Sequence, residues 1–160
     1  MTSGARTVDW ATYDAVLFDL DGVITPTAEV HMRAWESMFN GYLTSRADEQ
    51  ATYTDADYFA HVDGKPRYDG VRDFLASRGI VLPEGTSDDG PARETVRGLG
   101  NRKNNAFNEV LARDGVAAYP GSLALLDHLA SLGLPMAVVS SSVNAPAVLT
   151  AAGLLDRFQT

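Results

Sequence analysis

The sequence contains no cysteine, which excludes disulfide bonds, thiolate zinc sites and cysteine nucleophiles. It has only two lysines, Lys65 and Lys103, and its 21 acidic residues outnumber 13 basic ones, so the net charge is −8. This charge argues against a nucleic-acid surface, because phosphate backbones need clustered Lys and Arg. No apolar run approaches the roughly 18 residues of a membrane span, and the N-terminus has no signal pattern. We therefore predict a cytoplasmic protein that binds neither nucleic acid nor membrane.

An apolar fraction of 45% is typical of a folded domain. Residues 1–14 are polar and indicate a loose lead-in. The short apolar run 15–18 ("AVLF"), followed by a turn signal, predicts a strand that is buried on both faces. Thr25 and Pro26 are typical of a helix start, with Thr25 as the capping residue, and apolar residues at helical spacing extend this helix to about Leu43.

The middle of the chain, about 44–118, contains helical patterns at 68–80 and 104–116 and no strand-like alternation. A helix over 122–133 and a second apolar strand over 134–142 follow, and then a helix over 145–153 that Asn144 can cap and Gly153 can end. A strand, a helical insert and then helix, strand and helix is an α/β pattern. We predict a core formed by 1–24 and 119–160, with an all-helical lobe at 25–118 inserted after the first strand.

Asp19 and Asp21 follow the first predicted strand, where open α/β sheets place their ligands. Alternation along the chain puts both carboxylates on one side and turns Leu20 away. Two such close carboxylates repel, so we expect a divalent cation or a raised pKa on one of them. A plain Asp-Gly turn with a chance acidic neighbour is the simpler alternative. A calcium-binding EF-hand loop does not fit, because Val23 and Thr25 stand where that loop needs an oxygen ligand and its glycine-centred frame.

Ser140, Ser141 and Ser142 end the second predicted strand, which a parallel sheet would place beside the first. Hydroxyl groups beside the amides of a following helix can hold an anion, although three serines alone are also typical of an ordinary loop. Paired carboxylates and hydroxyls at the ends of adjacent strands together favour a binding site over two chance features.

The segments "VLFDLDGVIT", "TAEVHMRAW", "YPG" and "VVSSS" resemble the haloacid dehalogenase superfamily, and specifically its beta-phosphoglucomutase-like hydrolases with a helical cap. The resemblance covers nearly the whole chain and implies a Rossmann-like core. It implies that Asp19 is a nucleophile that takes a phosphoryl group and that Asp21 is the general acid and base. It also implies that Asp19 and the Asp21 backbone carbonyl bind Mg²⁺. Ser140 would contact the phosphoryl group, with Ser141, Ser142 and Asn144 nearby.

In the inserted lobe, which the resemblance identifies as the cap, the candidates for substrate contact are Thr27, His31, Trp35, Arg67 and Lys103. In sugar-phosphate mutases of this family a histidine at the position of His31 couples the hinge to the acid/base. Arg67 and Lys103 match cap residues that contact substrate and its distal phosphate, and Lys65 and Arg102 are weaker candidates of the same kind. An ordinary helical histidine and solvated surface charges are the alternatives.

Two features depart from the family pattern. Pro26 replaces an aspartate in the hinge, which restricts the backbone of Thr25. The family also needs a lysine after its Ser/Thr motif and an acidic pair that completes the Mg²⁺ shell. Both lysines of this chain precede Ser140, only Asp156 is acidic after Ser142, and Asp88 and Asp89 lie in a cap loop. The chain therefore looks like the first two-thirds of such an enzyme. We expect it to be nearly inactive alone, since one preorganised contact is worth roughly 100- to 1,000-fold in rate.

Three functions remain open from the sequence. The first is a beta-phosphoglucomutase-like phosphosugar mutase, Mg²⁺-dependent and acting on a small sugar phosphate. The second is a phosphatase of a small phosphorylated metabolite, in which water takes the phosphoryl group. The third is a non-catalytic module with a vestigial site.

Overall fold

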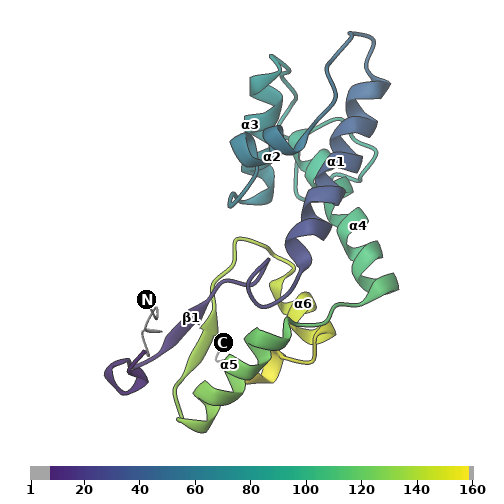
Figure 1. Ribbon diagram of the computed structural model, residues 1–160. Coiled ribbons are helices and arrows are strands. Elements are labelled where there is room, and N and C mark those ends of the chain that lie inside the picture. Colours follow the sequence, from purple (N-terminus) through teal and green to yellow (C-terminus); the bar gives the residue numbers. More distant parts are fainter. Residues whose placement is uncertain (1–7, 159–160) are drawn as a thin grey trace, which may run out of the picture.

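The computed structural model describes residues 8–158, which form a helical lobe above a smaller α/β unit (Figure 1). The predicted lead-in, 1–14, lies partly outside the described residues. The elements in chain order are a 3₁₀ helix (Trp10–Thr12), β1 (Val16–Phe18), α1 (Thr27–Ser45), α2 (Asp55–His61), α3 (Arg67–Ser77), α4 (Val96–Asp114), α5 (Pro120–Ser131), β2 (Met136–Val138), α6 (Ala145–Ala151) and a second 3₁₀ helix (Leu155–Arg157).

The two strands pair in parallel, with Val16 opposite Met136 and Phe18 opposite Val138. Parallel pairing brings the carboxyl ends of both strands to the same edge, where the chain faces the helical lobe. Helices α1 to α4 lie between the strands in sequence without any strand among them, which agrees with the predicted α/β core with an all-helical insert.

The α/β unit packs its core on one side of this small sheet. Phe18 and Met136 join Leu126 and Leu129 of α5 in a buried cluster that also includes Val148 of α6. Leu17 points the other way and is 67% exposed. The expected burial of 15–18 on both faces is therefore wrong for residues 8–158, because the helices of this part of the chain cover only one face.

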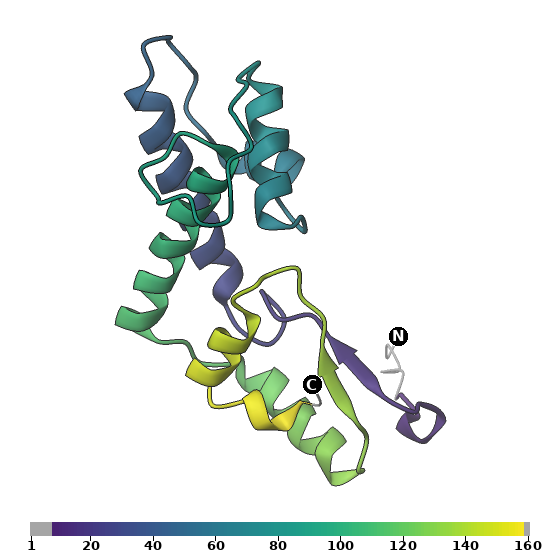
Figure 2. The ribbon, with the colours of Figure 1, turned by 180° about the vertical axis from the view of Figure 1, so that it is seen from behind.

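The helical lobe has its own buried cluster, which includes aromatic side chains of α1 and α3. Phe39 packs on Phe74 with ring centroids 4.2 Å apart, and Trp35 stacks on Phe39 at 5.3 Å. Helices α1 and α4 lie side by side, seen from both directions (Figures 1 and 2), and they take part in both clusters, since Ala34 and Phe107 pack with the α/β unit. These two helices therefore connect the helical lobe to the α/β unit through side-chain packing.

Two helix starts differ from the prediction. Helix α1 begins at Thr27 with Pro26 in the capping position, so Thr25 is not the cap; its hydroxyl pairs with that of Thr27 at 2.8 Å instead. Helix α4 begins at Val96, eight residues before the predicted start, because the Thr95 hydroxyl accepts from the Gly98 amide at 2.9 Å. The glycines of this first turn hide the helical pattern in the sequence.

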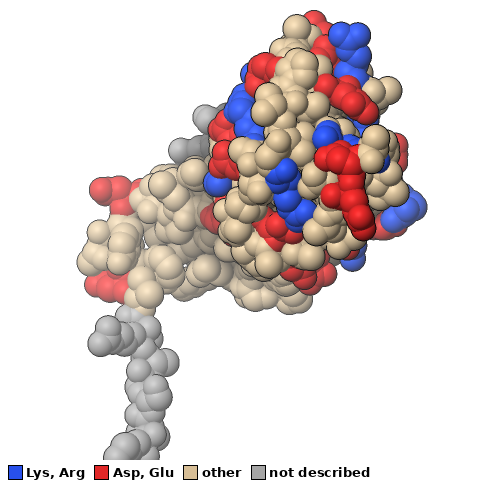
Figure 3. All heavy atoms as spheres, turned by 90° about the horizontal axis from the view of Figure 1, so that it is seen from above, with Lys and Arg blue, Asp and Glu red and all other residues tan. Residues whose placement is uncertain are grey.

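The upper surface of the helical lobe carries Lys and Arg side chains intermixed with Asp and Glu (Figure 3). Glu84, for example, accepts hydrogen bonds from both Arg72 and Arg97. Over the described range, none of the helices combines the length and the apolar character that crossing a membrane requires.

Candidate active site

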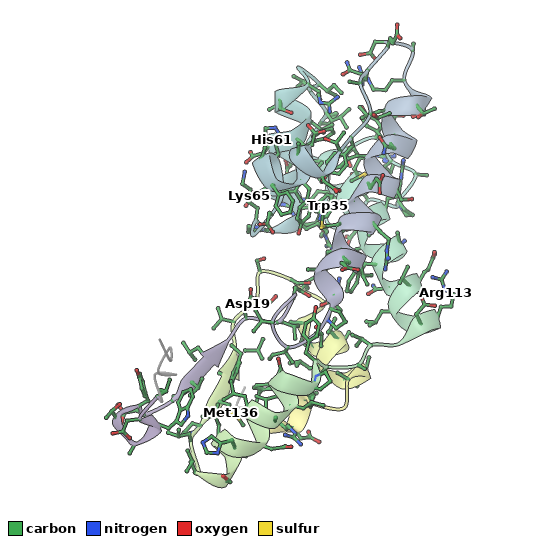
Figure 4. All side chains as sticks on the ribbon, viewed as in Figure 1. Asp19, Trp35, His61, Lys65, Arg113 and Met136 are labelled. Atoms are coloured by element: carbon green, nitrogen blue, oxygen red, sulfur yellow. The ribbon has the colours of Figure 1, made fainter. Side chains whose placement is uncertain are left out.

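A cavity of about 610 Å³ lies where the carboxyl ends of the strands meet the helical lobe. It brings together most of the site residues that the sequence predicts: Asp19, Asp21, His31, Trp35, Arg67, Lys103, Ser140, Ser141, Ser142 and Asn144. Figure 4 shows Asp19 at the end of β1, below Lys65 and Trp35 of the helical lobe. Thr27 lies outside the lining but contacts Asp21, and Arg102 lies away from the cavity with its Nε donating to the Pro91 carbonyl.

The loop after β1 sets the two aspartates. Leu20 is completely buried while Asp19 is exposed and Asp21 half-buried, which is the predicted alternation. The Asp19 Oδ1 accepts from the Leu20 amide at 2.7 Å, so the carboxylate is held by its own loop. Gly22 adopts φ +80°, a conformation that side chains disfavour, and its amide donates to the Thr25 carbonyl at 2.7 Å. This tight turn reverses the chain into α1.

A chain of hydroxyls fixes the Asp21 carboxylate. The Thr27 hydroxyl donates to Asp21 Oδ1. Since Thr27 gives its proton to Asp21, the contact between the Thr25 and Thr27 hydroxyls must have Thr25 as the donor. His31 adds a longer contact from the next helical turn, with Nε2 3.5 Å from the same carboxylate oxygen. Asp21 is thus oriented by the first turns of α1, although its backbone belongs to the strand loop.

His31 and Lys103 form a buried pair behind Asp21. The Lys103 Nζ lies 2.6 Å from His31 Nδ1, and the imidazole stacks on Phe107 with centroids 4.0 Å apart. The ammonium also lies 5.1 Å from the centre of the Trp35 ring, and Lys103 is only 4% exposed. The lysine of α4 therefore reaches Asp21 through the histidine of α1.

The pKa values of this group shift together. Burial lowers the pKa of Lys103 to about 7, with the charge of Arg67 contributing and Asp21 opposing. Burial also lowers the pKa of His31, against the effect of its contact with Asp21. Burial favours protonated Asp21, but contacts with His31 and Thr27 outweigh it, so the pKa of Asp21 lies below its usual value. The expectation of a raised pKa is therefore wrong for Asp21, because donors surround it.

Residues 139–144, between β2 and α6, form a loop that we call the serine loop, and hydrogen bonds within it fold it back on itself. The Ser142 amide donates to Ser140 Oγ at 3.0 Å, and the Asn144 amide donates to Ser142 Oγ at 3.2 Å. Both hydroxyls accept, so each still has its own proton to donate into the cavity. Asn144 occupies the capping position of α6, but its side chain makes no capping bond there; it donates to Asn104 Oδ1 at 2.8 Å. The predicted capping by Asn144 is wrong for this reason.

Arg67 lines the opposite wall at the start of α3. Its Nη2 donates to the Tyr68 hydroxyl at 2.9 Å, and that hydroxyl donates to Asn101 Oδ1 at 2.8 Å. Its Nε and Nη1 atoms are buried with no partner in the structure. A buried guanidinium with two free donors is well suited to an anionic oxygen.

Sequence reasoning missed Tyr68, Asn101 and Asn104. Tyr68 and Asn101 hold Arg67, whereas Asn104 contacts the serine loop. Tyr68 and Asn104 directly follow predicted site residues in the sequence, but their roles depend on contacts with distant segments that no local pattern reveals.

The metal prediction finds partial support in the donor set. Asp19 offers an exposed carboxylate in the cavity, whereas the Asp21 carboxylate is engaged by Thr27 and His31. Nowhere in residues 8–158 do three or more His, Asp or Glu side chains gather as a metal site would require. The described residues therefore do not by themselves fit a complete metal shell.

Aspartates after β1 and serines after its parallel neighbour β2 thus line one cavity between an α/β unit and a helical lobe. The model of the haloacid dehalogenase-like hydrolase family matches residues 13–160. The chain belongs to this family.

Individual relatives are similar over most of the chain. A beta-phosphoglucomutase of Mycobacterium tuberculosis is 51% identical over 149 residues, which cover 90% of this chain and 56% of the relative. Hexitol phosphatase A of Escherichia coli is 30% identical over 125 residues, covering 78% of this chain and 47% of the relative. The chain thus spans about half the length of these curated relatives. A solved beta-phosphoglucomutase from Clostridium difficile shares the fold with a TM-score of 0.70 at 24% identity, covering 91% of this chain and 59% of that one.

Proposed function

We propose that this chain carries the nucleophile and the acid/base half of a phosphosugar mutase site. Asp19 attacks phosphorus through a carboxylate oxygen, the bond from phosphorus to the sugar oxygen breaks, and Asp21 gives that oxygen a proton. A second sugar hydroxyl then attacks the aspartyl-phosphate, Asp21 takes its proton, and Asp19 is released. The proton count balances over the two half-reactions.

The observation that carries this proposal is the contact of Thr27 and His31 with Asp21, with Lys103 behind His31, in the cavity that Asp19 also lines. A lowered pKa keeps Asp21 ionised in the ligand-free site, which suits the base half of the cycle. For the acid half, the negative charge of a bound phosphate raises the pKa of a nearby carboxyl. A carboxylate held between such donors and an arriving phosphate can therefore serve in both directions.

Ser140 and Ser142 would hold the transferring phosphoryl group through their free hydroxyl protons, with Ser141 and Asn144 nearby. Asp19 and the Asp21 backbone carbonyl would be two of the ligands of Mg²⁺, which would neutralise charge between the carboxylate and the phosphate when bound. We assign the core to 1–24 and 119–160 and the cap to 25–118. The buried residues of one hydrophobic cluster all lie within this cap, and those of the other lie in the core apart from Ala34 and Phe107.

A sugar phosphate with a second anionic group is the substrate class we favour, because Arg67 has two free donors on the wall opposite the serine loop. The names of the beta-phosphoglucomutase relatives agree with this choice. Release of phosphate to water is the second candidate, favoured by the similarity to hexitol phosphatase A.

The test is phosphorylation of the chain itself. Acetyl phosphate with Mg²⁺ is incubated with the protein for hours, long enough to tolerate a rate reduced about 1,000-fold, and the acid-quenched protein is analysed by intact mass and peptide mapping. We expect one phosphoryl group on Asp19, lost in Asp19→Asn and retained in the exposed control Asp14→Asn. A chain that stays unmodified, or an Asp19→Asn variant that is still labelled, contradicts the proposal and favours a non-catalytic module.

Mutase and phosphatase are separated by supplying a hexose 1-phosphate with a trace of the bisphosphate. Isomerisation supports the mutase, and release of free phosphate supports the phosphatase. Mutase turnover that is unchanged in Arg67→Ala would show that Arg67 does not hold a second phosphate.

A further inference from the structure

Two neighbouring residues of α4 contact the two loops that form the floor of the cavity. Lys103 reaches the loop after β1 through His31 and Asp21, and Asn104 contacts the loop after β2 through Asn144. One rigid helix thus touches both halves of the site. Across the part of the chain that the structure describes, the bond from Asn144 to Asn104 is the side-chain hydrogen bond that joins α4 to the serine loop.

The Asn144 side chain gives up a favourable alternative to make this bond. Asparagine in a capping position normally accepts from an amide of the first helical turn. Asn144 instead turns toward α4, is only 8% exposed, and leaves α6 without a side-chain cap. If the Asn144 side chain turned to cap α6, it would lose its bond to Asn104 of α4. The orientation of Asn144 therefore depends on where the helical lobe places α4.

The location of the bond matters for motion between the lobes. The helical lobe is tied covalently to the α/β unit by the loop 19–26 and by residues 115–119, where Gly115 has φ +64°. Both links lie at the lower ends of α1 and α4 (Figure 2). A rotation about these links that moved α4 away from the serine loop would open the cavity, and it would have to break the Asn104–Asn144 bond on the cavity wall.

We infer that Asn104 is a positioning residue that, together with Asn144, latches the helical lobe closed over the cavity and fixes the serine loop beneath it. Asn104 need not touch the substrate for this role. One hydrogen bond of this kind shifts an equilibrium between closed and open forms by about 2- to 10-fold. The inference concerns the arrangement of the lobes and holds whether or not Asp19 is phosphorylated.

The absence of cysteine gives a direct test on the whole chain. Cysteines placed at Val81, which is 92% exposed in the helical lobe, and at Leu132, which is exposed after α5, take a pair of spin labels. Pulsed electron–electron double resonance then measures the distribution of distances between the two spin labels, one in each lobe. We expect Asn104→Ala and Asn144→Ala each to raise the population of longer distances by about 2- to 10-fold. The double variant should match the single ones.

Asn105→Ala is the matched control, because Asn105 is the next residue of α4, exposed, and makes no hydrogen bond to the serine loop. Asn144→Ser separates the latch from helix capping, since serine caps well but is too short to reach α4. We expect Asn144→Ser to open the lobes and Asn104→Asp, which keeps an acceptor, to leave them closed. Distances that do not change in Asn104→Ala and Asn144→Ser, or that change equally in Asn105→Ala, overturn the inference.

Discussion

The side-chain nitrogens of His31 and Lys103 lie 2.6 Å apart in the buried wall of the cavity. When the Lys103 ammonium donates to Nδ1, the proton of a neutral imidazole lies on Nε2, which is 3.5 Å from Asp21 Oδ1. The burial that lowers the pKa of His31 favours this neutral form. Lys103 of α4, His31 of α1 and Asp21 of the strand loop therefore lie in one row, with contacts of 2.6 Å and 3.5 Å between their side chains.

Lys103 should make the free energy of unfolding depend on pH above neutrality. Its pKa is about 7 in the folded chain and about 10.4 when unfolded, so between these values the unfolded state binds more protons. The free energy of unfolding should therefore increase as pH rises from 7 to 10. Below pH 7 the full cost of burying the charged Lys103 ammonium should be present. Urea titrations at several pH values should show that Lys103→Met loses this gain. Lys65→Met, at the exposed second lysine, should follow wild type; a parallel change there would contradict the assignment to Lys103.

Thr27→Val should loosen Asp21 with little change in shape. The variant removes the hydroxyl that donates to the carboxylate, so the pKa of Asp21 should rise and the free energy of unfolding should fall by about 1–2 kcal/mol at neutral pH. Carboxyl carbon NMR titration and urea unfolding measure the two effects. Thr44→Val is the control, because its exposed hydroxyl bonds only to the Asn40 carbonyl within α1. An unshifted Asp21 titration in Thr27→Val would remove Thr27 from the site.

Two helical glycines should respond oppositely to alanine. A Cβ at Gly41 of α1 meets nothing within 4 Å, so Gly41→Ala should stabilise the chain by about 0.5–1 kcal/mol. A Cβ at Gly100 of α4 would lie 2.6 Å from the Tyr68 ring. Gly100→Ala should therefore displace Tyr68 and its partner Arg67, and cancel the helical gain. Thermal unfolding of both variants tests this, and equal stabilisation would show that Tyr68 does not restrict the side chain at position 100.

Arg67→Ala should weaken binding of a hexose bisphosphate by roughly 10-fold or more, since it removes two buried donors to an anion. Binding of inorganic phosphate, which the serine loop would hold, should change less. Arg113→Ala is the control, because Arg113 is exposed, pairs with Asp114 and points away from the cavity (Figure 4). Calorimetry with both ligands separates the outcomes. Equal losses for the two ligands would indicate a general charge effect instead of a distal clamp.

Local pattern was sufficient where one segment decides its own structure. The apolar run before Asp19 predicts β1, the spacing of Val71, Phe74 and Leu75 predicts α3, and Gly79 ends that helix with φ +66°. Pattern failed at two helix starts, where hydrogen bonds between near neighbours set the boundary. Thr25 bonds to Thr27 and does not cap α1, and the Thr95 cap starts α4 earlier than its apolar pattern indicates.

The sequence by itself determined the family, the α/β order with its helical insert, and the position of Asp19 and Asp21 after the first strand, because these depend on residue types at fixed short spacings. Only the tertiary structure decided the state of those groups. Burial of Lys103 against Trp35 and Phe107, its contact with His31, and the lowered pKa of Asp21 arise where α4 packs on α1. The hydrogen bond from Asn144 to Asn104 likewise depends on the position of α4 beside the serine loop. Desolvation and hydrogen bonding depend on which distant side chains meet, and the spacing of residues along a chain does not specify that meeting.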